Sequence, residues 1–564
     1  MAGARTLAAA LLAAAASAAP TVTVTTPSGP VTGLAFDTHN AFLGVPYGTQ
    51  ERWRPSTVIA PWTAAVDATH DPVGCPQICF TDEPPHICPV AQSEDCLFLN
   101  VFAPAVPSAA PREVLVFIHG GNFHDGYVGG YDTNGGLLYD GKVWTNATGS
   151  IIVSINYRLG ALGFLYGGGA ARGTTLEGNY GLGDQITALT WVRENIGAFG
   201  GDAARVTVIG QSAGSMSISA HLARPANAGL FSGAIMLSNP FAEPYRGPDQ
   251  AASIAAAFAN FSGCGPNWVF ESDWAPLEAC LRQKDTATIL AASAASEVAL
   301  LADLTAILQV VVAWGPTKGT PLMPARPLEA FQSGNVLDVP IIIGTTANET
   351  VIFVYEALDF PLSELLYEAA VALIVAPAAL PALNKLYPLP VPAPADYRTF
   401  AAYPLTDGLF LCPTRNATEA MMAAQPARRS GTYVYQYSHL MSWGATMWGS
   451  NFTECDNEVC HGSDLPALFL PTEKPDPAFG TYTPGEWALG ITMQQYYSNF
   501  AATGAPGVPA GGIAWPRYDA KTRQTMNYQT SDAGGLSLLT AVRADYCAFW
   551  GKGRAGGAAR RAWL

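Results

Sequence analysis

The chain contains a series of short, continuous runs of apolar and β-branched residues, and each run is followed by Gly, Asn or Ser. Such runs are typical of buried strands in a largely parallel sheet, because helices cover both faces of that sheet. The segments between the runs have helical spacing, so the order of elements predicts an α/β fold. The predicted strands are residues 114–118, 151–155, 206–209, 234–237, 339–343 and 432–437.

Two long stretches interrupt this alternation. Residues between 234 and 339, and those from 358 to about 403, are rich in Ala, Leu and Pro and predict helices. We expect these helices to be insertions that stand over one edge of the sheet. Because the chain has no internal repeat and no disordered linker, we expect residues 19–564 to form one domain.

The first residues, MAGARTLAAALLAAAASAAP, have the layout of a secretory signal peptide, with a basic Arg5, an apolar run and a small-residue cleavage site near Ala18. The apolar run is too short to cross a bilayer, which argues against a spanning helix. The C-terminal residues lack the long apolar tail of a glycolipid anchor. We therefore expect residues 1–18 to be removed and the protein to be secreted without a stable membrane anchor.

Charge and cysteine content agree with an extracellular protein. The formal net charge of −15 disfavours binding to nucleic acid or to anionic membranes, since both are polyanions. The even number of cysteines favours disulfides, and the spacing of the first four lacks the paired C-x-x-C motifs of a zinc site. Four glycosylation sequons begin at Asn146, Asn260, Asn416 and Asn451.

One predicted strand ends in VTVIGQSAGS, residues 206–215. A lone G-x-S-x-G match is weak, but here a strand precedes it and a helical segment, AGSMSISAHL, follows it. Gly210 and Gly214 permit a turn too tight for Cβ atoms, and the helix directs free amides toward the serine oxygen. The arrangement predicts that Ser212 is a nucleophile at a strained turn.

A nucleophilic serine needs a base and a group that orients the base, and in α/β-hydrolases the acid and then the histidine follow the serine along the chain. His439 and His461 are the histidines in the last third. His439 ends a predicted strand, where a structural role is usual, whereas His461 lies in a cysteine-containing loop followed by Gly462. We therefore predict His461 as the base. Glu349 directly follows the strand 339–343, at the sheet edge where α/β sites form, and is the predicted acid.

Glycines also follow the strand 114–118, in the segment VFIHGGNFHDG. Bare backbone amides at Gly120 and Gly121 would stabilise the charge of a tetrahedral intermediate. The strand, the serine turn, the acid, the histidine and this loop together predict acyl transfer by a serine, with no metal and no cofactor.

The chain closely resembles the type B carboxylesterase and cholinesterase family of α/β-hydrolases over nearly all of residues 25–550. The matching segments are LGVPYG, SEDCLFLNVFAP, HGGNF, INYRLGALGFL, GNYGLGDQ, WVRENIGAFGGD, VTVIGQSAGS, GTTANET, CHGSDLP and CAFW. The resemblance implies a large, mostly parallel central sheet with helices on both faces. It also implies a triad of Ser212, Glu349 and His461.

The resemblance further implies that the amides of Gly121, Asn122 and Ala213 form the oxyanion hole. It implies two ion pairs, Arg52–Glu94 and Asp407–Arg543. The disulfides that it implies are Cys75–Cys96, Cys264–Cys280 and Cys412–Cys547, which leaves Cys79–Cys88 and Cys455–Cys460 to pair by elimination.

Departures from the family pattern bear on substrate. Cholinesterases have Glu before the nucleophile and Trp in the first disulfide loop, whereas this chain has the neutral Gln211 and no Trp between Cys75 and Cys96. A quaternary ammonium would lose both an anion and an aromatic face. Asn122 replaces a glycine of the oxyanion loop, but Asn tolerates positive φ and the hole uses backbone amides.

The expected function is that of a secreted serine esterase that hydrolyses small, neutral carboxylic esters through an acyl-enzyme. A lipase acting on longer acyl chains is the alternative enzyme, because the apolar insertions could cover an acyl tunnel. A non-catalytic adhesion protein of the same family is the alternative from another class, and the presence of all three triad residues argues against it. The sequence does not determine the oligomeric state.

Overall fold

The computed structural model describes residues 19–78, 88–129, 138–265, 272–301, 313–375, 377–442, 453–471 and 482–556. The predicted signal peptide, residues 1–18, lies outside the described residues. Within them, no helix is both long enough and apolar enough to cross a bilayer.

The described residues build one sheet of 13 strands and a small two-stranded sheet. Its central strands, from β9 to β14, pair in parallel, and antiparallel strands extend it at both ends. The central strands, in spatial order, are β9 (Ile151–Ile155), β8 (Arg112–Ile118), β10 (Gly201–Gln211), β11 (Gly233–Leu237), β12 (Ile341–Thr346), β13 (Thr432–Tyr437) and β14 (Gln524–Tyr528). The flanking strands are β1 (Thr21–Thr25), β2 (Pro30–Ala35), β3 (His39–Pro46), β6 (Val66–Ala68), β7 (Phe98–Pro104) and β15 (Ser537–Thr540), and the small sheet is β4 (Gly48–Thr49) with β5 (Thr57–Val58).

Every predicted strand is present, and the boundaries differ most at β10 and β12. The run at 206–209 is the buried end of the longer β10, whose first residues are more polar. The run at 339–343 begins too early, because β12 starts at Ile341. Pro340 has no N–H to donate, and its carbonyl accepts a hydrogen bond from Ala234 N at 3.0 Å.

Alternate side chains of the central strands enter two different cores. In β8, Val114, Val116 and Ile118 belong to one buried cluster, whereas Leu115 and Phe117 belong to another. This is the period of two expected for a strand, and it gives the sheet one core on each face. The helices α3 (Tyr180–Asn195), α4 (Ala213–Leu222), α9 (Pro327–Ser333) and α14 (Cys412–Ala424) contribute to the first core, and α1 (Lys142–Thr148), α16 (Asp464–Phe469) and α17 (Pro484–Thr503) contribute to the second.

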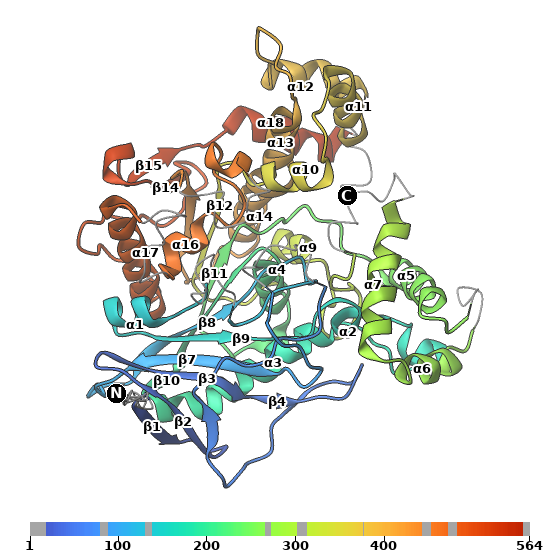
Figure 1. The fold of residues 1–564 in the computed structure, drawn as a ribbon. Helices are drawn as coiled ribbons and strands as arrows, with labels where there is room; N and C mark the ends of the chain where they lie inside the picture. Colours follow the sequence, from blue (N-terminus) through green and yellow to red (C-terminus); the bar gives the residue numbers. More distant parts are fainter. Residues whose placement is uncertain are drawn as a thin grey trace, which may run out of the picture.

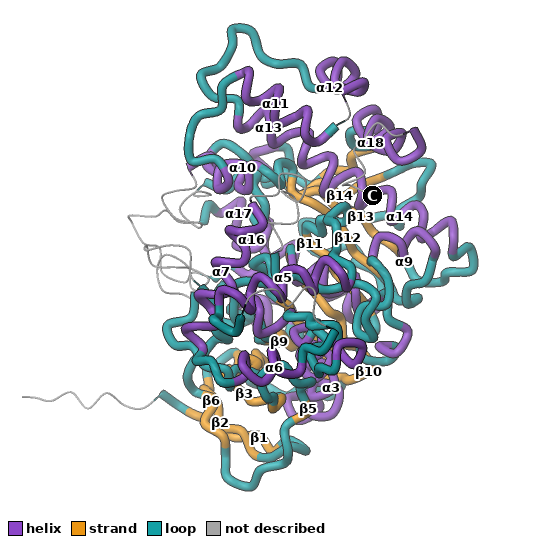
Figure 2. Tube along the Cα trace, turned by 90° about the vertical axis from the view of Figure 1, so that its right-hand side faces the viewer, coloured by secondary structure: helices purple, strands orange, loops and turns teal. Residues whose placement is uncertain are grey.

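The two predicted insertions are helical and lie apart from each other (Figures 1 and 2). The first comprises α5 (Pro248–Phe261), α6 (Ala275–Arg282) and α7 (Thr286–Leu301), which share a core with Trp53 and with apolar residues between 161 and 180. The second contains α11 (Glu364–Ile374), α12 (Leu380–Leu386) and α13 (Arg398–Leu405), which pack with α18 (Ala544–Gly556) near α10 (Val351–Ala357). The insertions are therefore two small layers, each with its own packing.

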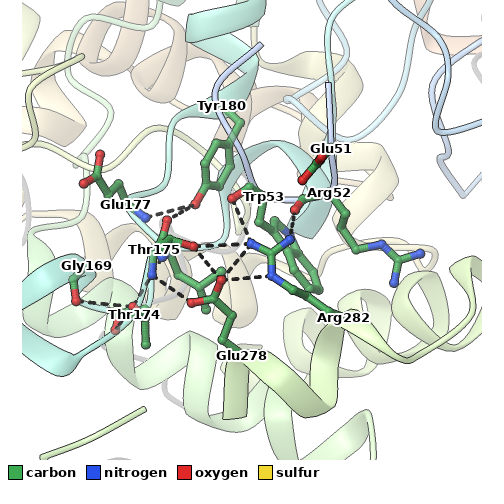
Figure 3. Close-up of polar contacts among 12 residues, drawn as sticks. Glu51, Arg52, Trp53, Gly169, Thr174, Thr175, Glu177, Tyr180, Glu278 and Arg282 are labelled. Carbon is green, nitrogen blue, oxygen red and sulfur yellow. Dashed lines mark hydrogen bonds and ion pairs between the residues drawn. The ribbon is translucent and has the colours of Figure 1, made fainter. Parts of the chain in front are cut away.

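The first insertion is held to the N-terminal part of the chain by a polar network (Figure 3). Arg282, at the end of α6, donates to the backbone carbonyls of Arg52 and Trp53 and pairs with Glu278 at 2.7 Å. Glu278 also accepts a hydrogen bond from Thr175 N at 2.8 Å. These bonds fix α6 against the loop between β4 and β5 and the segment before α3.

Four of the predicted disulfides are present, namely Cys75–Cys96, Cys264–Cys280, Cys412–Cys547 and Cys455–Cys460. The predicted Cys79–Cys88 pair is not among them, because Cys79 lies outside the described residues. Both predicted ion pairs form, Arg52 with Glu94 and Arg543 with Asp407.

Candidate active site

Ser212 lies at the sharp turn between β10 and α4. Its backbone has φ 54° and ψ −121°, a conformation that is costly for a residue other than glycine. Two backbone hydrogen bonds close the turn. The Ser212 amide donates to Leu237 O at 3.0 Å, and the Ser212 carbonyl accepts from Met216 N at 2.8 Å. The strained turn holds the side chain at the end of the sheet rather than inside the helix.

The glycines on either side of Ser212 are required by close backbone contacts. A Cβ at Gly214 would lie 1.9 Å from Ile118 O, and one at Gly210 would lie 2.7 Å from the carbonyl carbon of Gly214. Real Cβ atoms do not approach backbone so closely. The predicted need for both glycines is therefore explained by α4 crossing directly over the end of β8.

The predicted oxyanion loop lies against this turn. A Cβ at Gly120 would lie 3.0 Å from the Cβ of Ser212. Gly121 has φ 99° and Asn122 has φ 50°, so Asn122 adopts the left-handed conformation that Asn tolerates. Their amides make no hydrogen bond within the described part of the chain, and Ala213 N–H belongs to the first turn of α4, where amides have no partner inside the helix. The predicted donors thus belong to a loop and a helix start that both adjoin Ser212.

Glu349 and His461 come from two loops that the fold brings together. Glu349 is fully buried, and one of its oxygens accepts a hydrogen bond from Thr346 N at 2.7 Å. Its other oxygen accepts from His461 Nδ1 at 2.6 Å. The neighbouring Asn348 N donates to Val459 O at 3.1 Å, which ties the two loops together through their backbones.

The imidazole of His461 is also held by packing. Its ring centroid lies 4.9 Å from that of Phe353 and 5.3 Å from that of Phe410. The Cys455–Cys460 disulfide closes the loop directly before it. With Nδ1 bonded to a carboxylate and the ring packed against two aromatic side chains, the histidine has one orientation, and Nε2 is the nitrogen that is turned away from Glu349.

Nε2 of His461 does not bond Ser212 in this structure. Among the described residues, its hydrogen-bond partner is Nε2 of Gln211, at 2.9 Å. Because Nδ1 carries the proton that is donated to Glu349, Nε2 is an acceptor and the Gln211 amide donates to it. Gln211 therefore occupies the lone pair that a serine hydroxyl would use. Nothing in the sequence pattern indicated this contact, since the two residues are 250 positions apart.

A second carboxylate lies behind the acid–base pair and was also missed. Asp464, the first residue of α16, is fully buried and accepts a hydrogen bond from Tyr435 Oη at 2.9 Å. Burial and the nearby charge of Glu349 raise its pKa to about 6. Its position two residues after Gly462 in the segment CHGSDLP could have suggested that it lies near the site, although not that its pKa is raised.

His439, the alternative histidine, lies elsewhere. It contacts Glu486 at 3.3 Å and Thr530 Oγ1 at 3.3 Å, and neither residue belongs to the serine turn. The structure thus brings His461, and not His439, to Glu349 and to the residue before Ser212. Within the described ranges, no group of three or more His, Cys, Asp or Glu side chains could hold a metal ion.

Comparison with known proteins shows the family of the chain. A family model described as the carboxylesterase family matches residues 20–550. The cAMP-regulated D2 protein of Dictyostelium discoideum is 34% identical over 523 residues, covering 90% of this chain and 89% of that protein. The para-nitrobenzyl esterase of Bacillus subtilis is 32% identical over 514 residues, covering 89% of this chain and 94% of the enzyme.

A solved structure of a PNB esterase superposes on this fold with a TM-score of 0.74 at 28% sequence identity, covering 94% of this chain and 99% of that one. The similarity in fold thus extends along nearly the whole chain. The predicted α/β-hydrolase fold is confirmed.

Proposed function

Because the chain belongs to the carboxylesterase family, we propose that it hydrolyses neutral carboxylic esters through an acyl-enzyme on Ser212. The observation that carries the proposal is the Glu349–His461 hydrogen bond of 2.6 Å, made beside a strained serine turn. A buried carboxylate bonded to Nδ1 leaves Nε2 as a base, which is the arrangement that activates a serine hydroxyl.

In the proposed reaction, Ser212 Oγ attacks the ester carbonyl while His461 Nε2 takes the hydroxyl proton. The amides of Gly121, Asn122 and Ala213 donate to the oxyanion of the tetrahedral intermediate. His461 then protonates the leaving alcohol, and the same nitrogen deprotonates the water that hydrolyses the acyl-enzyme. Glu349 fixes the imidazole tautomer and stabilises the imidazolium in both halves of the reaction.

This sequence requires the Gln211 amide to leave Nε2 before Ser212 donates to it. The exchange replaces one neutral hydrogen bond by another, so its cost is at most that of one such bond. Catalytic hydrogen bonds are often absent in a resting site and form when substrate binds. The observed contact between Gln211 and His461 therefore describes a resting state of the proposed enzyme.

Secretion is part of the proposal. Disulfides form and persist in oxidising compartments, and four are found in the described chain. The sequon residues Asn146 and Asn260 are exposed, and Asn416 is partly exposed, so all three are reachable for glycosylation. Asn451 lies outside the described residues.

The decisive test is covalent labelling of the serine. A fluorophosphonate should label one site per chain, the label should map to Ser212, and Ser212→Ala should lose both label and activity. Ser215→Ala is the matched control, because Ser215 is a buried serine in α4, the helix that directly follows Ser212, and it should keep both. A folded protein that takes no label would support the non-catalytic alternative instead.

Acyl-chain preference separates the two enzymatic alternatives. We expect p-nitrophenyl esters of short acids to be hydrolysed with the highest kcat/KM, as for an esterase acting on small neutral esters. A kcat/KM that keeps rising toward long acyl chains would identify a lipase.

A further inference from the structure

The loop that follows β8 carries a carboxylic acid that the proposed mechanism does not use. This residue, Asp125, folds back against Gly121. A Cβ at Gly121 would lie 2.1 Å from Asp125 Oδ1 and 2.3 Å from Asp125 O. Together with the φ of 99° at Gly121, this close approach requires glycine there. A residue that is proposed to donate to the oxyanion therefore has the Asp125 carboxyl as its neighbour.

The backbone of the same turn directs a second proposed donor. His124 N and Asp125 N donate to Gly121 O at 2.8 Å and 3.1 Å. The Gly121 carbonyl belongs to the same peptide unit as the Asn122 N–H, and in a planar trans peptide these two groups point in opposite directions. The two bonds thus direct the Asn122 amide away from the amides of His124 and Asp125. The turn of residues 121–125 fixes the orientation of an oxyanion donor.

The Asp125 carboxyl contributes little to the stability of this turn. Within the described ranges, its Oδ1 is buried without a hydrogen-bond partner. Burial raises the pKa of Asp125 to about 7, and the nearby charge of Glu356 in α10 raises it further. An unpaired carboxyl is costly to ionise away from water. A carboxyl kept at such a place beside proposed catalytic groups points to a role in the reaction.

The other titratable groups in or beside this turn are those of His119, His124, Tyr139, Tyr157 and Glu356. Burial lowers the pKa of both histidines to about 4. Burial also raises the pKa of both tyrosines. These four side chains are therefore uncharged near neutral pH, and Glu356 is the group whose charge acts on Asp125.

We propose that Asp125 is a positioning residue of the oxyanion loop and that it supports ester hydrolysis in its uncharged form. The uncharged carboxyl packs against Gly121 without opposing the oxyanion. Once ionised, it places a second negative charge beside the amides that have to stabilise the oxyanion, so hydrolysis slows. The inference rests on the proposed function and adds regulation by pH, because the slowing sets in as the pH rises through about 7.

The test compares the full chain with Asp125→Asn, which keeps the shape of the side chain but cannot ionise. For each, kcat/KM on phenyl acetate is measured from about pH 5.5 to about pH 8.5, and the ratio of variant to parent removes the limb that both owe to His461. At the acidic end Asp125 is uncharged, and the ratio should be roughly one. At the alkaline end it should rise roughly ten- to hundredfold, the effect of one nearby charge. The midpoint of the rise should lie near pH 7.

Two further variants assign the effect to Asp125. Glu356→Gln removes the charge that helps to raise the pKa of Asp125, so the alkaline fall in kcat/KM should move to lower pH. Glu243→Gln is the matched control. Glu243 is also buried with one unpaired oxygen, and burial raises its pKa to about 8, but its charged neighbours are Arg246 and Arg326. Its pH profile should match that of the parent. Thermal melting checks that each variant is folded.

The outcomes separate this inference from the proposed function. A parent that hydrolyses no ester and takes no fluorophosphonate label removes the proposed function, and this inference with it. If the parent is active and labelled, a ratio that does not change with pH overturns the inference alone. Where Asp125→Asn does not fold, an alkaline fall that Glu356→Gln leaves unmoved overturns it instead.

Discussion

Two buried Glu–His pairs occur in the described chain, and they are alike in burial. His461 and His439 are each 8% exposed, while Glu349 is 0% and Glu486 is 1% exposed. The nitrogen-to-oxygen distance is 2.6 Å between His461 and Glu349 and 3.3 Å between His439 and Glu486. Burial and pairing do not by themselves identify an acid–base site, so the distinction has to come from what surrounds each pair.

The pair of His439 and Glu486 is part of a helix start. Glu486 forms a capping box with Thr483 and accepts from both the amide and the hydroxyl of Ser442. Burial alone would raise the pKa of Glu486, but its hydrogen bonds, that of His439 first, lower it to about 2. The ionised carboxylate therefore stabilises the folded chain fully above the ordinary pKa of a glutamate, and this contribution is lost as the pH falls toward 2, while His439 helps to join β13 to α17.

The pair of Glu349 and His461 is less saturated. Apart from His461, the hydrogen bond that Glu349 accepts is from Thr346 N. The remaining nitrogen of His461 faces Gln211, the last residue of β10. The two pairs therefore differ in the second ring nitrogen, which contacts Thr530 in His439 and faces the residue before Ser212 in His461.

Replacing each histidine in turn should give the largest difference in kcat between the two Glu–His pairs. His461→Ala should lower kcat by roughly five to six orders of magnitude, as loss of the base does in other serine hydrolases. His439→Ala should leave kcat near that of the parent and lower the melting temperature, because it removes one partner of a buried network. Steady-state kinetics and thermal melts on both variants give the answer. If the larger kinetic loss follows His439→Ala, the assignment of the base is wrong.

Neutralising the carboxylate of each pair should give the next largest difference in kcat. In Glu349→Gln the side chain keeps its shape, but its amide can donate to Nδ1 and favour the wrong tautomer, so we expect kcat to fall by roughly 10⁴-fold. Glu486→Gln should change stability and leave kcat within a few-fold. Equal kinetic losses in the two variants would mean that both pairs affect the site through the fold.

Much of this site follows from the sequence because its serine half is local. Gly210, Ser212 and Gly214 lie within five residues, and the strand and helix beside them are indicated by their own hydrophobic patterns. Glu349 could be predicted because it follows a buried strand, and the carboxyl ends of parallel strands share one edge. Local pattern and topology together give these positions without any knowledge of packing.

Other features could not be predicted because they depend on packing between distant segments. Gln211 contacts His461 across 250 positions, and the raised pKa of Asp464 arises from burial beside Glu349. The choice between His439 and His461 rested on local sequence alone. His439 ends a predicted strand, whereas His461 lies in a cysteine-containing loop before Gly462. Periodicity reports which face of an element is buried, but not which side chain it meets.

Replacing Gln211 should have a smaller effect on kcat/KM, and it tests the contact that distinguishes the His461 pair from the His439 pair. Gln211→Leu keeps the volume and removes the amide from His461 Nε2, so Ser212 no longer competes for the lone pair. We expect kcat/KM to rise by up to roughly tenfold, the value of one neutral hydrogen bond. The matched control is Gln185→Leu, because Gln185 Oε1 contacts His221 Nε2 at 2.7 Å in a buried pair elsewhere, and this variant should alter stability alone. A fall of kcat/KM comparable to that of Glu349→Gln would show that Gln211 acts in the transition state instead.

The smallest expected effect concerns the charge of the leaving group, and it follows from the neutrality of the residue that faces His461. With Gln211 in place of a carboxylate, and with no tryptophan between Cys75 and Cys96, a quaternary ammonium loses an ion attraction and a cation–π contact, the latter worth roughly 0.5–2 kcal/mol. Butyrylcholine and its neutral isostere, 3,3-dimethylbutyl butyrate, have nearly the same shape. The ratio of their kcat/KM values should therefore be one or should favour the neutral ester, and added salt should not change it. A preference for the cation that weakens with salt would mean that other acidic or aromatic side chains near Ser212 form a cation site. That outcome would remove the argument for neutral substrates but would leave the proposed acyl-enzyme chemistry of Ser212 and His461 in place.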